Sequence, residues 1–433
     1  MSRKQEHIVF LGIGGIGMSA IARHYLKKGV PVFGYDKVRT KLTDELVAEG
    51  AIVTYRDDAE DYPGWAEEQV TVIYTPALPR DLGWLAFFKD FGMIKRAEAL
   101  GLLANSARCL AIAGTHGKTS TSAMLLHILT VAGEDPTGFI GGIMSESGTN
   151  YRLGEGPWVV VEADEFDRSF MHLHPEAAAV TTIDADHLDV YGNVGELTGA
   201  FEAFVGQVSG PTFTGADLRP SETVLGESAK VHAKEVRPAH GAYKFTLVVD
   251  GVEHTTNLKM PGAHNVYNAT LAAALAHYAG VDGARIAAAL SSFKGIKRRF
   301  EFHCEQPVII EDYAHHPTEL HALLDSVEAL YPSKKVALVF QPHLYSRTRD
   351  FMDGFIEELA RATHTLLLPI YPARELPIEG VESEKIAEKI PHAEAIEKGE
   401  LAGKLKALHP EVVLMVGAGD IGDLVGTVKA KLA

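Results

Sequence analysis

The sequence predicts an α/β protein divided into three domains, at residues 1–107, 108–297 and 298–433. Apolar strands alternate with helices along most of the chain, which is typical of parallel sheets covered by helices. An apolar strand also runs into a glycine turn and a helix near Gly12, Gly114 and Gly417, so the same local unit recurs in each part of the chain. A length of 433 residues fits three domains, because domains commonly span ~100–200 residues.

The composition indicates a globular protein that acts on small molecules. Hydrophobic residues make up 46% of the chain and charged residues 23%, which is ordinary for a soluble enzyme. The net charge of −16 argues against nucleic acid or an anionic membrane as the partner, because both require a basic surface. Cys109 and Cys304 lie far apart and suggest neither a disulfide framework nor a cysteine metal site. No apolar stretch approaches ~18 residues, and we expect a cytoplasmic protein.

The first domain opens with a dinucleotide-type fingerprint. Residues 7–12 read as a buried parallel strand, followed by the turn Gly12-Ile-Gly-Gly-Ile-Gly17 and a helix over 18–28. Backbone N–H groups at such a turn bind a diphosphate, and Asp36, which ends the next strand, stands where a ribose-binding acid would lie. The pattern suits any diphosphate, so it identifies no nicotinamide cofactor, and a tight turn without a ligand is the alternative. Further strands are expected near 51–53 and 71–74.

The central motif is Gly114-Thr-His-Gly-Lys-Thr119, which follows an apolar strand and opens a helix that stops at Gly133. The glycine turn and the positive end of the helix dipole favour anionic oxygens. Lys118 would contact β and γ phosphates, and the Thr119 hydroxyl would hold the magnesium ion that bridges them. Ile112 stands where the strict phosphate-loop spacing has glycine, so this is a shorter variant of that loop.

Acidic residues follow two strands next to this loop. The strand over 158–164 ends in Glu162 and Asp164, and the strand over 177–183 leads into Asp184-Ala-Asp-His-Leu-Asp189. Carboxylates at the ends of parallel strands beside a phosphate loop are placed to bind magnesium. The glycine-rich span 138–156 is predicted to be a loop over the binding face.

The remainder of the middle domain has two recognisable elements. Residues 244–259 alternate around Asp250 and Gly251, which predicts an antiparallel hairpin. An alanine-rich helix then runs from Asn265 to Ala279. Asn265 either caps that helix or contacts a base, and the sequence leaves both readings open.

The third domain follows a cluster of cations, Lys297, Arg298 and Arg299. Its predicted strands cover 308–312, 335–341, 364–369 and 412–416. Two of them end in chemically reactive segments, Asp312-Tyr-Ala-His-His-Pro317 and Gln341-Pro-His-Leu-Tyr-Ser-Arg-Thr-Arg349. Because the carboxyl ends of strands carry ligands in open α/β sheets, we expect both segments to face one cleft.

These motifs, in this order, resemble the Mur ligase family over nearly the whole chain. The resemblance rests on Gly12 to Met18, Gly114 to Thr119, Glu162 to Glu165, Asp186-His187, His264-Asn265, Arg298 to Phe300, Asp312 to Pro317 and His343 to Arg349. It implies a Rossmann-like UDP-binding domain, a central ATPase-type phosphate-loop domain and a C-terminal Rossmann-like domain. The His-His-Pro and Tyr-Ser-Arg-Thr-Arg segments are most similar to the branch that joins L-alanine to the lactyl carboxylate of UDP-N-acetylmuramate, using ATP and Mg²⁺, or Mn²⁺ in its place.

The resemblance also implies roles for individual residues. Lys118, Glu162, His187, His315 and Arg347 would be catalytic, and Thr119, Glu162 and His187 would bind the metal. ATP would contact Gly114, Thr115, His116, Gly117, Lys118, Thr119, Ser120, Asn265, Arg298, Arg299 and Asp312. The UDP-sugar would contact Gly14, Gly15, Ile16, Gly17, Asp36 and Thr75. The amino acid and the acyl phosphate would lie near Tyr313, His315, His343 and Arg347.

The family mechanism would form an acyl phosphate that L-alanine attacks, so we expect the third domain to close over the site and exclude water. As partners, the resemblance implies UDP-N-acetylmuramate, L-alanine and ATP, without nucleic acid or membrane. It implies a monomer or weak homodimer.

Some positions depart from the family pattern. Residues 188–229 contain no lysine that could carry the carbamate of several later Mur ligases. Leu344 stands where related alanine ligases often have arginine, and Ala314 replaces a common glycine. Neither change removes a charge that the mechanism requires.

Three other functions compete with this interpretation. A ligase that recycles a tripeptide onto the same nucleotide sugar is the closest. A nicotinamide-dependent dehydrogenase built on Gly12 to Gly17 and Asp36 would leave Lys118, Thr119 and Glu162 without a role. A nonenzymatic nucleotide sensor is the third.

Overall fold

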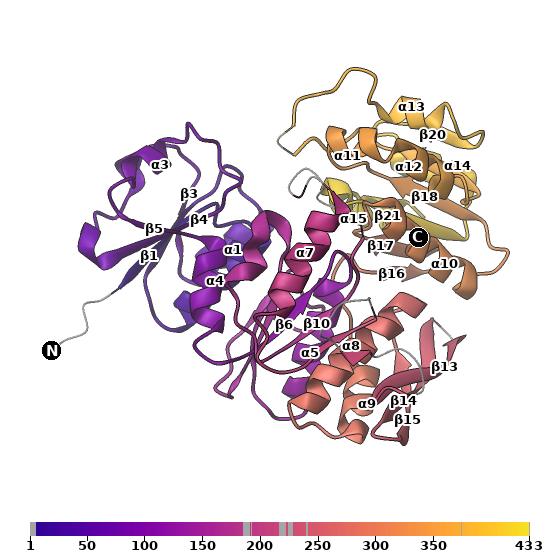
Figure 1. The fold of residues 1–433 in the computed structure, drawn as a ribbon. Coiled ribbons are helices and arrows are strands. Elements are labelled where there is room, and N and C mark those ends of the chain that lie inside the picture. Colours follow the sequence, from indigo (N-terminus) through magenta and orange to yellow (C-terminus); the bar gives the residue numbers. More distant parts are fainter. Residues whose placement is uncertain are drawn as a thin grey trace. The chain divides into compact units, whose positions relative to one another are not determined.

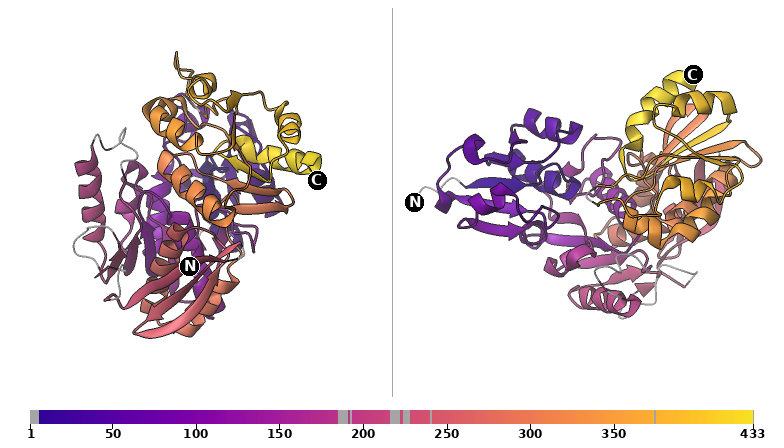
Figure 2. Two further views of the ribbon diagram at one scale, coloured as in Figure 1. Left: turned by 90° about the vertical axis from the view of Figure 1, so that its right-hand side faces the viewer. Right: turned by 90° about the horizontal axis from the view of Figure 1, so that it is seen from above.

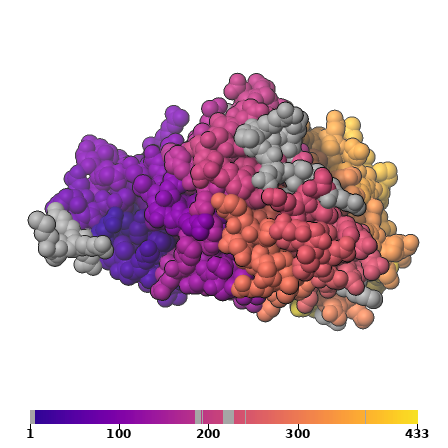
Figure 3. Space-filling view, turned by 60° about the horizontal axis from the view of Figure 1, so that its bottom comes forward, coloured from indigo at the N-terminus to yellow at the C-terminus, as the bar shows by residue number. Residues whose placement is uncertain are grey.

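The computed structural model describes residues 6–184, 191, 193–215, 222–223, 228–239, 241–373 and 375–432, which are coloured by sequence in Figures 1 and 3. The chain forms two compact units. The first unit comprises Met1–Lys234, Thr246–Thr256 and Tyr267–Phe293, and the second comprises Glu235–Phe245, Asn257–Val266 and Lys294–Ala433. The division into domains 1–107, 108–297 and 298–433 stays a prediction.

The first unit begins with a parallel sheet of five strands in the order β3-β2-β1-β4-β5. The strands are β1 (His7–Leu11), β2 (Val32–Tyr35), β3 (Ile52–Thr54), β4 (Val70–Tyr74) and β5 (Gly92–Lys95). The helices between them are α1 (Ile16–Lys27), α2 (Lys41–Ala48), α3 (Gly83–Phe87) and α4 (Arg96–Ala104), with the 3₁₀ turns η1 (Ala59–Asp61) and η2 (Glu67–Gln69). The four strands expected from apolar runs in this region are present.

The same unit holds a seven-stranded sheet in the order β12-β11-β10-β6-β9-β7-β8, in which only β8 is antiparallel to its neighbour. Its strands are β6 (Arg108–Ala113), β7 (Thr137–Phe139), β8 (Tyr151–Arg152), β9 (Trp158–Glu162), β10 (Ala177–Val180), β11 (Thr212–Thr214) and β12 (Glu222–Thr223). The other helices of this unit are α5 (Lys118–Val131), η3 (Phe166–His172), α7 (Val194–Val205), α9 (Gly283–Ser292) and α8 (Ala263–Tyr278) from Tyr267 onward, since the first residues of α8 belong to the second unit.

The prediction of a loop over 138–156 is confirmed for 140–150 and 153–156 and is wrong for 138–139 and 151–152, which are strand residues. Phe139 pairs with Tyr151 and Gly138 with Arg152, so β7 and β8 form a short hairpin that adds to the sheet. The glycines of this span were interpreted as loop residues. Gly138 is instead a strand residue that packs closely against α5, since a Cβ there would collide with Leu126. The hairpin therefore holds the intervening segment against the sheet.

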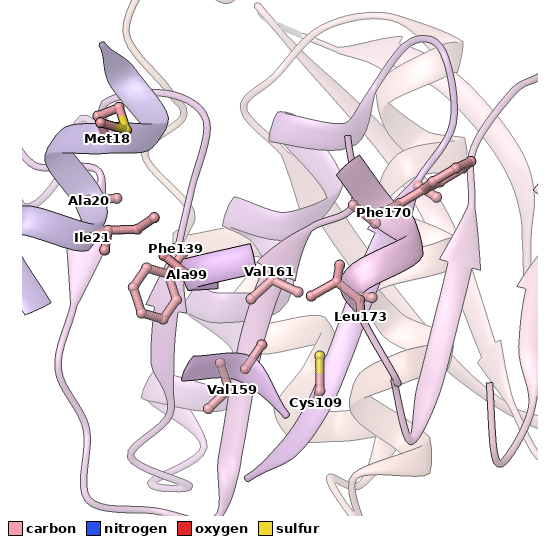
Figure 4. Packing of buried hydrophobic residues seen from close by; sticks show 14 of the residues in the cluster. Met18, Ala20, Ile21, Ala99, Cys109, Phe139, Val159, Val161, Phe170 and Leu173 are labelled. Atoms are coloured by element: carbon pink, nitrogen blue, oxygen red, sulfur yellow. The ribbon is translucent and has the colours of Figure 1, made fainter. Parts of the chain in front are cut away.

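Apolar side chains join the two sheets of the first unit into one core. Its cluster includes Met18 and Ile21 of α1, Phe139 of β7 and Val161 of β9 (Figure 4). Cys109 lies in the same cluster and is 1% exposed, and burial raises the pKa of its thiol to about 12. Cys109 and Cys304 are both free. Cys109 thus belongs to the packing of the core.

A buried histidine in this core makes stability depend on pH. His24 on α1 places Nδ1 2.8 Å from the Tyr151 hydroxyl. Burial, with a smaller effect of Lys28, lowers the pKa of His24 from 6.5 to about 4. Between pH 6.5 and about pH 4, His24 is protonated in the unfolded chain but not in the folded chain. The free energy of unfolding therefore falls as the pH falls through this range, and His24 causes no loss of stability above pH 6.5.

We therefore expect His24 to account for a loss of about 2 kcal/mol of unfolding free energy between pH ~7 and pH ~4.5. Urea unfolding across this range should give a flatter profile for His24→Gln than for the unsubstituted chain. His172→Gln, which changes an exposed histidine, should leave the profile in place. Parallel profiles for His24→Gln and the unsubstituted chain would contradict this account.

A three-stranded sheet is formed by β13 (Val231–Ala239), β14 (Ala242–Val249) and β15 (Val252–Leu258), in that order. Asp250 and Gly251, between β14 and β15, have φ values of +48° and +79°. Positive φ at both central residues is the requirement of a tight hairpin turn whose twist matches the strands. The predicted hairpin is confirmed.

The second unit contains a six-stranded sheet in the order β16-β17-β21-β18-β19-β20, parallel except for β16. Its strands are β16 (Glu301–Glu305), β17 (Val308–Asp312), β18 (Val336–Phe340), β19 (His364–Leu367), β20 (Ala393–Ala395) and β21 (Val412–Val416). Its helices are α10 (Pro317–Leu330), α11 (Tyr345–Asp350), α12 (Met352–Leu359), α13 (Ser383–Ala387), α14 (Leu401–Leu408) and α15 (Val425–Leu432), with the 3₁₀ turn η4 (Asp420–Leu424).

Helices cover both faces of this sheet (Figure 2). Ile310 and Leu414 pack in a cluster with side chains of α10 and α12, whereas their neighbours Ile309 and Val413 pack in a cluster with side chains of α14 and α15. Successive residues of a strand point to opposite faces, so a doubly covered parallel sheet needs continuous apolar strands. The predicted α/β class is confirmed. Within the part of the chain that is described, no helix has both the length and the apolar character to cross a membrane.

Candidate functional site

The N-terminal glycine turn leads into the start of α1. Gly12 has φ +89°, and a Cβ there would lie 2.7 Å from Cγ2 of Thr75, so Thr75 borders the turn. The Asp36 carboxylate accepts the Gly14 N–H at 2.8 Å, and the Gly15 N–H donates to the Gly12 carbonyl at 3.2 Å. The N–H groups of the first helical turn have no intrahelical acceptor. Those at Ile16 and Gly17 are therefore the ones best placed for a diphosphate.

A cation that the sequence analysis missed lies against this turn. A Cβ on Gly17 would be 2.8 Å from Nη1 of Arg96, the first residue of α4. Arg96 also pairs with Asp164 at 3.1 Å, just beyond β9. Its position depends on how α4 packs near α1, which no local pattern encodes. Arg96 adds positive charge beside the Gly17 end of the turn.

The phosphate loop joins β6 to α5 as its motif predicts. Gly114 and Gly117 have φ values of +123° and +85°. A Cβ on Gly114 would collide with Thr181, and one on Gly117 would lie 2.6 Å from Oδ1 of Asn268 on α8. Both positions therefore require glycine for backbone conformation and for space. The loop is held by Thr182, whose carbonyl accepts the Thr115 N–H at 2.9 Å and whose hydroxyl accepts the His116 N–H at 3.2 Å.

Lys118 is folded onto its own loop and paired with a carboxylate. Its Nζ donates to the Gly114 carbonyl at 2.5 Å and lies 2.7 Å from Oε2 of Glu165, a side chain that is fully buried. Burial lowers the pKa of Lys118, but the neighbouring carboxylates, Glu165 first, outweigh burial and leave that pKa raised. The ammonium group is therefore charged and ready to pair with phosphate oxygens. Glu165 belongs to the Glu162 to Glu165 motif, but no role was predicted for its side chain.

Glu162, at the end of β9, lies beside the Thr119 hydroxyl. Its carboxylate accepts from the Gly141 N–H at 2.6 Å, the Ser122 hydroxyl at 3.0 Å and the Thr119 hydroxyl at 3.2 Å. Burial raises the pKa of Glu162, while these hydrogen bonds and Lys118 oppose the shift. A hydroxyl and a carboxylate are the hard oxygen ligands that Mg²⁺ prefers. The residues present fit the predicted magnesium ion.

The edge next to β10 carries the other acids. The Asp184 N–H donates to the Thr115 hydroxyl at 3.0 Å, and the Asp184 carboxylate lies 3.5 Å from Nε2 of His116. His187, predicted to bind metal, lies outside the described residues, as do its neighbours Asp186 and Asp189. The prediction for His187 therefore stays a prediction.

In the second unit, the predicted residues gather where β17 and β18 end. Both strands run parallel to β21 between them, so their carboxyl ends share one edge. The rings of Tyr313 and His315 have centroids 5.3 Å apart, and those of His315 and His343 are 6.1 Å apart. Arg347 Nη1 lies 3.4 Å from Nδ1 of His343. The sheet edge expected from strand topology thus brings Tyr313, His315, His343 and Arg347 together.

Arginines and carboxylates both lie around this edge. The guanidinium groups of Arg298 and Arg299 each lie 5.0 Å from the Tyr313 ring, and Arg299 is 3.7 Å from Glu319. Burial is the main cause that lowers the pKa of His343 to about 4, and it also lowers the pKa of His315. Both histidines are therefore neutral near pH 7 and can accept hydrogen bonds. Tyr371, which the sequence analysis missed, stacks on His343 with centroids 5.7 Å apart.

Two residues predicted to contact ATP have partners inside the fold. Asp312 accepts the Ala314 and Phe300 N–H groups, each at 2.8 Å, and burial raises its pKa to about 6. Asn265 lies within α8, which begins at Ala263, and donates to the Pro261 carbonyl at 2.7 Å. The reading of Asn265 as a helix cap is wrong, because the helix starts two residues earlier. A contact with adenine stays a prediction.

One further cluster was not expected from the sequence. Glu301, His303 and Glu311 place ligand atoms within 4.8 Å of one another across β16 and β17. The pair is irregular between Phe302 and Cys304, which alters the path of β16 next to His303. Nε of Arg298 lies 2.9 Å from Oε1 of Glu311, and Nε2 of His303 lies 2.9 Å from Oε2 of the same carboxylate. Both oxygens of Glu311 therefore already have a nitrogen partner.

Comparison with protein families gives matches along nearly the whole chain. Residues 7–108 match the Mur ligase family catalytic domain, residues 112–276 the Mur ligase middle domain, and residues 298–426 the Mur ligase glutamate ligase domain. The UDP-N-acetylmuramate–L-alanine ligase of Christiangramia forsetii is 44% identical, covering 99% of this chain and 98% of that one.

Solved structures of ligases also match this chain over nearly its whole length. The UDP-N-acetylmuramate-alanine ligase of Thermotoga maritima matches with a TM-score of 0.84 and 29% identity, covering 98% of each chain. A murein peptide ligase of Psychrobacter arcticus matches with a TM-score of 0.72 over 99% of this chain and 98% of that one, and its 23% identity supports the shared fold alone. Neither the dehydrogenase nor the peptide-recycling interpretation is favoured by these matches.

Proposed function

Because this chain belongs to the Mur ligase family, we propose that it joins L-alanine to the lactyl carboxylate of UDP-N-acetylmuramate, releasing ADP and phosphate, in the synthesis of peptidoglycan precursors. The observation that carries this proposal is the full-length similarity to ligases named for that reaction, at 44% identity and, for a solved structure, a TM-score of 0.84. The phosphate loop with Lys118, Thr119 and Glu162 gives the chain the groups that an ATP-dependent step requires.

The chemistry explains why two anion sites are needed. A carboxylate is a poor acyl donor, so its oxygen first attacks the γ-phosphorus of ATP, and the bond from that phosphorus to the β,γ-bridging oxygen breaks. ADP leaves with the electron pair of that bond. The amine of L-alanine then attacks the acyl carbon, loses a proton and expels phosphate. Most of the catalysis is positioning and electrostatic stabilisation.

Residues of the first unit would hold the phosphates for this step. Lys118 would exchange Glu165 for β and γ oxygens, and the backbone of Gly114 to Ser120 would surround them. Thr119 and Glu162 would hold Mg²⁺, which supplies charge neutralisation between β and γ oxygens. The turn at Gly14 to Gly17 would bind the diphosphate of the nucleotide sugar. This assignment explains a dinucleotide-like fingerprint without a redox cofactor.

Residues of the second unit would serve the later stages. Arg298, Arg299 and Arg347 would supply positive charge for the acyl phosphate and the amino-acid carboxylate, and a neutral His315 or His343 would accept a hydrogen bond from the amine of L-alanine. We further propose domains at 1–107, 108–297 and 298–433, with the third closing over the site.

Since ATP and nucleotide sugars are cytoplasmic metabolites, we place the enzyme in the cytoplasm. We also propose that it is a monomer or weak homodimer.

A phosphate-release assay tests the proposal. With ATP, Mg²⁺ and UDP-N-acetylmuramate, L-alanine should stimulate phosphate release strongly, and the tripeptide L-Ala-γ-D-Glu-meso-diaminopimelate should not. Glycine and L-serine in place of L-alanine would define how selective the amino-acid site is. Stimulation by the tripeptide alone would establish the recycling reaction instead, and a change in nicotinamide absorbance with a 2-hydroxy acid would indicate a dehydrogenase.

A further inference from the structure

A buried amide next to the start of β8 hydrogen-bonds to the first turn of α1. Asn150, directly before β8, is 0% exposed. Its Nδ2 donates to the Ile16 carbonyl at 2.6 Å and to the Ser19 hydroxyl at 3.0 Å, and its Oδ1 accepts from Nη1 of Arg23 at 2.6 Å. All three partners belong to α1, and Ile16 is its first residue. One side chain thus fixes the first turn of the helix that carries the predicted diphosphate site.

The same hairpin also holds the predicted magnesium ligand. The Gly141 N–H, two residues beyond β7, donates to Glu162 at 2.6 Å, and the Ile140 N–H donates to the Asn150 carbonyl at 2.9 Å. A short hydrogen-bonded path therefore runs from Glu162 through Gly141, Ile140 and Asn150 to Ile16. The β7–β8 hairpin thus contacts one residue of each predicted anion site, Glu162 beside the phosphate loop and Ile16 in the glycine turn.

The surroundings of Asn150 make this arrangement rigid. Arg23 is 2% exposed and pairs with Glu45 on α2 at 2.9 Å and with Glu49, the residue directly after α2, at 2.8 Å. Its guanidinium is therefore held by two carboxylates as well as by Asn150. Phe139 and Tyr151 of the hairpin lie in the same apolar cluster as Ile21 of α1. Buried polar groups with every partner in place restrict the packing to one arrangement, because any shift leaves a group unsatisfied.

We propose that Asn150 is a positioning residue that sets the glycine turn of α1 at a fixed distance from the phosphate loop, so that the nucleotide sugar meets ATP in reactive geometry. The inference rests on the proposed function. Attack of the lactyl carboxylate on the γ-phosphorus needs the reacting atoms ~3–3.5 Å apart, and a misplacement of about 1 Å costs about 100-fold in rate. Asn150 touches neither substrate and acts through the first turn of α1.

Kinetics of Asn150→Ala test this proposal against a matched variant. Asn105, at the end of α4, also ties the two sheets together, since its Nδ2 donates to the His172 carbonyl and its Oδ1 accepts the His174 N–H, both at 2.9 Å. It lies about 13 Å along α4 from Arg96, the end near Gly17. Asn105 is exposed, so Asn105→Ala removes two amide hydrogen bonds without opening a buried space and without touching the turn.

For Asn150→Ala we expect kcat/KM for UDP-N-acetylmuramate to fall about 10- to 100-fold. The Kd of MgADP, measured by calorimetry on the full chain, should stay within about twofold, because the phosphate loop is untouched. Asn105→Ala should stay within about twofold in both measurements. Equal losses in the two variants, or a parallel loss of MgADP affinity in Asn150→Ala, would overturn the proposal.

Ser19→Ala keeps the test decisive if Asn150→Ala fails to fold. It removes one acceptor of the Asn150 amide and leaves the contact between Asn150 and Arg23. Its kcat/KM should fall about 3- to 10-fold with unchanged MgADP affinity. A Ser19→Ala variant with full activity beside an unfolded Asn150→Ala variant would show that the amide serves folding alone. An unsubstituted chain that forms no product would instead refute the proposed function.

Discussion

Lys118→Met is expected to lower phosphate release in the presence of UDP-N-acetylmuramate and L-alanine by about 100- to 1000-fold, the usual cost of removing one preorganised electrostatic group. Nζ of Lys118 is the cation nearest the loop backbone, at 2.5 Å from the Gly114 carbonyl. Methionine keeps most of the length of the side chain and removes the charge that would contact the β and γ oxygens. The Kd of UDP-N-acetylmuramate alone should change little, because the glycine turn of α1 is a separate element.

The Lys118 substitution needs a control for stability. It leaves the fully buried Glu165 without its cation, and an uncompensated buried charge is strongly destabilising. Lys118→Met combined with Glu165→Gln removes both charges, so the double variant should unfold at a higher temperature than Lys118→Met and remain as inactive. Lys89→Met changes an exposed lysine and should retain full activity. Activity that returned in the double variant would refute a direct role for Lys118.

Glu162→Gln is expected to lower kcat by about 100- to 1000-fold and to raise the Mg²⁺ concentration needed for half-maximal activity. Glutamine preserves one acceptor oxygen for the Gly141 N–H but lacks the negative charge that a magnesium ligand supplies. A titration of activity with Mg²⁺ measures both effects. Because the substitution is nearly isosteric, the thermal unfolding temperature should change much less than the activity.

Two variants separate the metal role of Glu162 from simple packing. Ser122→Ala removes one hydrogen bond to the Glu162 carboxylate, at 3.0 Å, and should reduce kcat less than tenfold, or about 1 kcal/mol, with a modest rise in the Mg²⁺ requirement. Glu155→Gln changes an exposed carboxylate in the same unit and should behave like the unsubstituted chain. An unchanged Mg²⁺ requirement in Glu162→Gln would exclude Glu162 as a ligand.

Local patterns were sufficient for the elements that carry the two anion sites. Gly12, Gly114 and Gly117 have positive φ, and each lies between an apolar strand and a helix, so a short window of sequence contains all the information for these turns. The order of strands and helices along the chain gave one further prediction. The segments that begin at Asp312 and Gln341 were expected to lie together, because parallel strands of one sheet end at the same edge.

The tertiary structure decided which groups become partners. Lys118 pairs with Glu165, 47 residues later, and Asn150 binds α1 across 134 residues. Asp36 engages the Gly14 N–H, and the span predicted as a loop contributes two strands to a sheet. The backbone conformation of a residue and the hydrophobic periodicity of a segment depend mainly on residues close in the sequence. The sequence therefore determined the turns and most strands and helices. The choice of a buried polar partner depends on how distant elements pack, because only burial makes an unpaired charge or amide costly enough to select one arrangement.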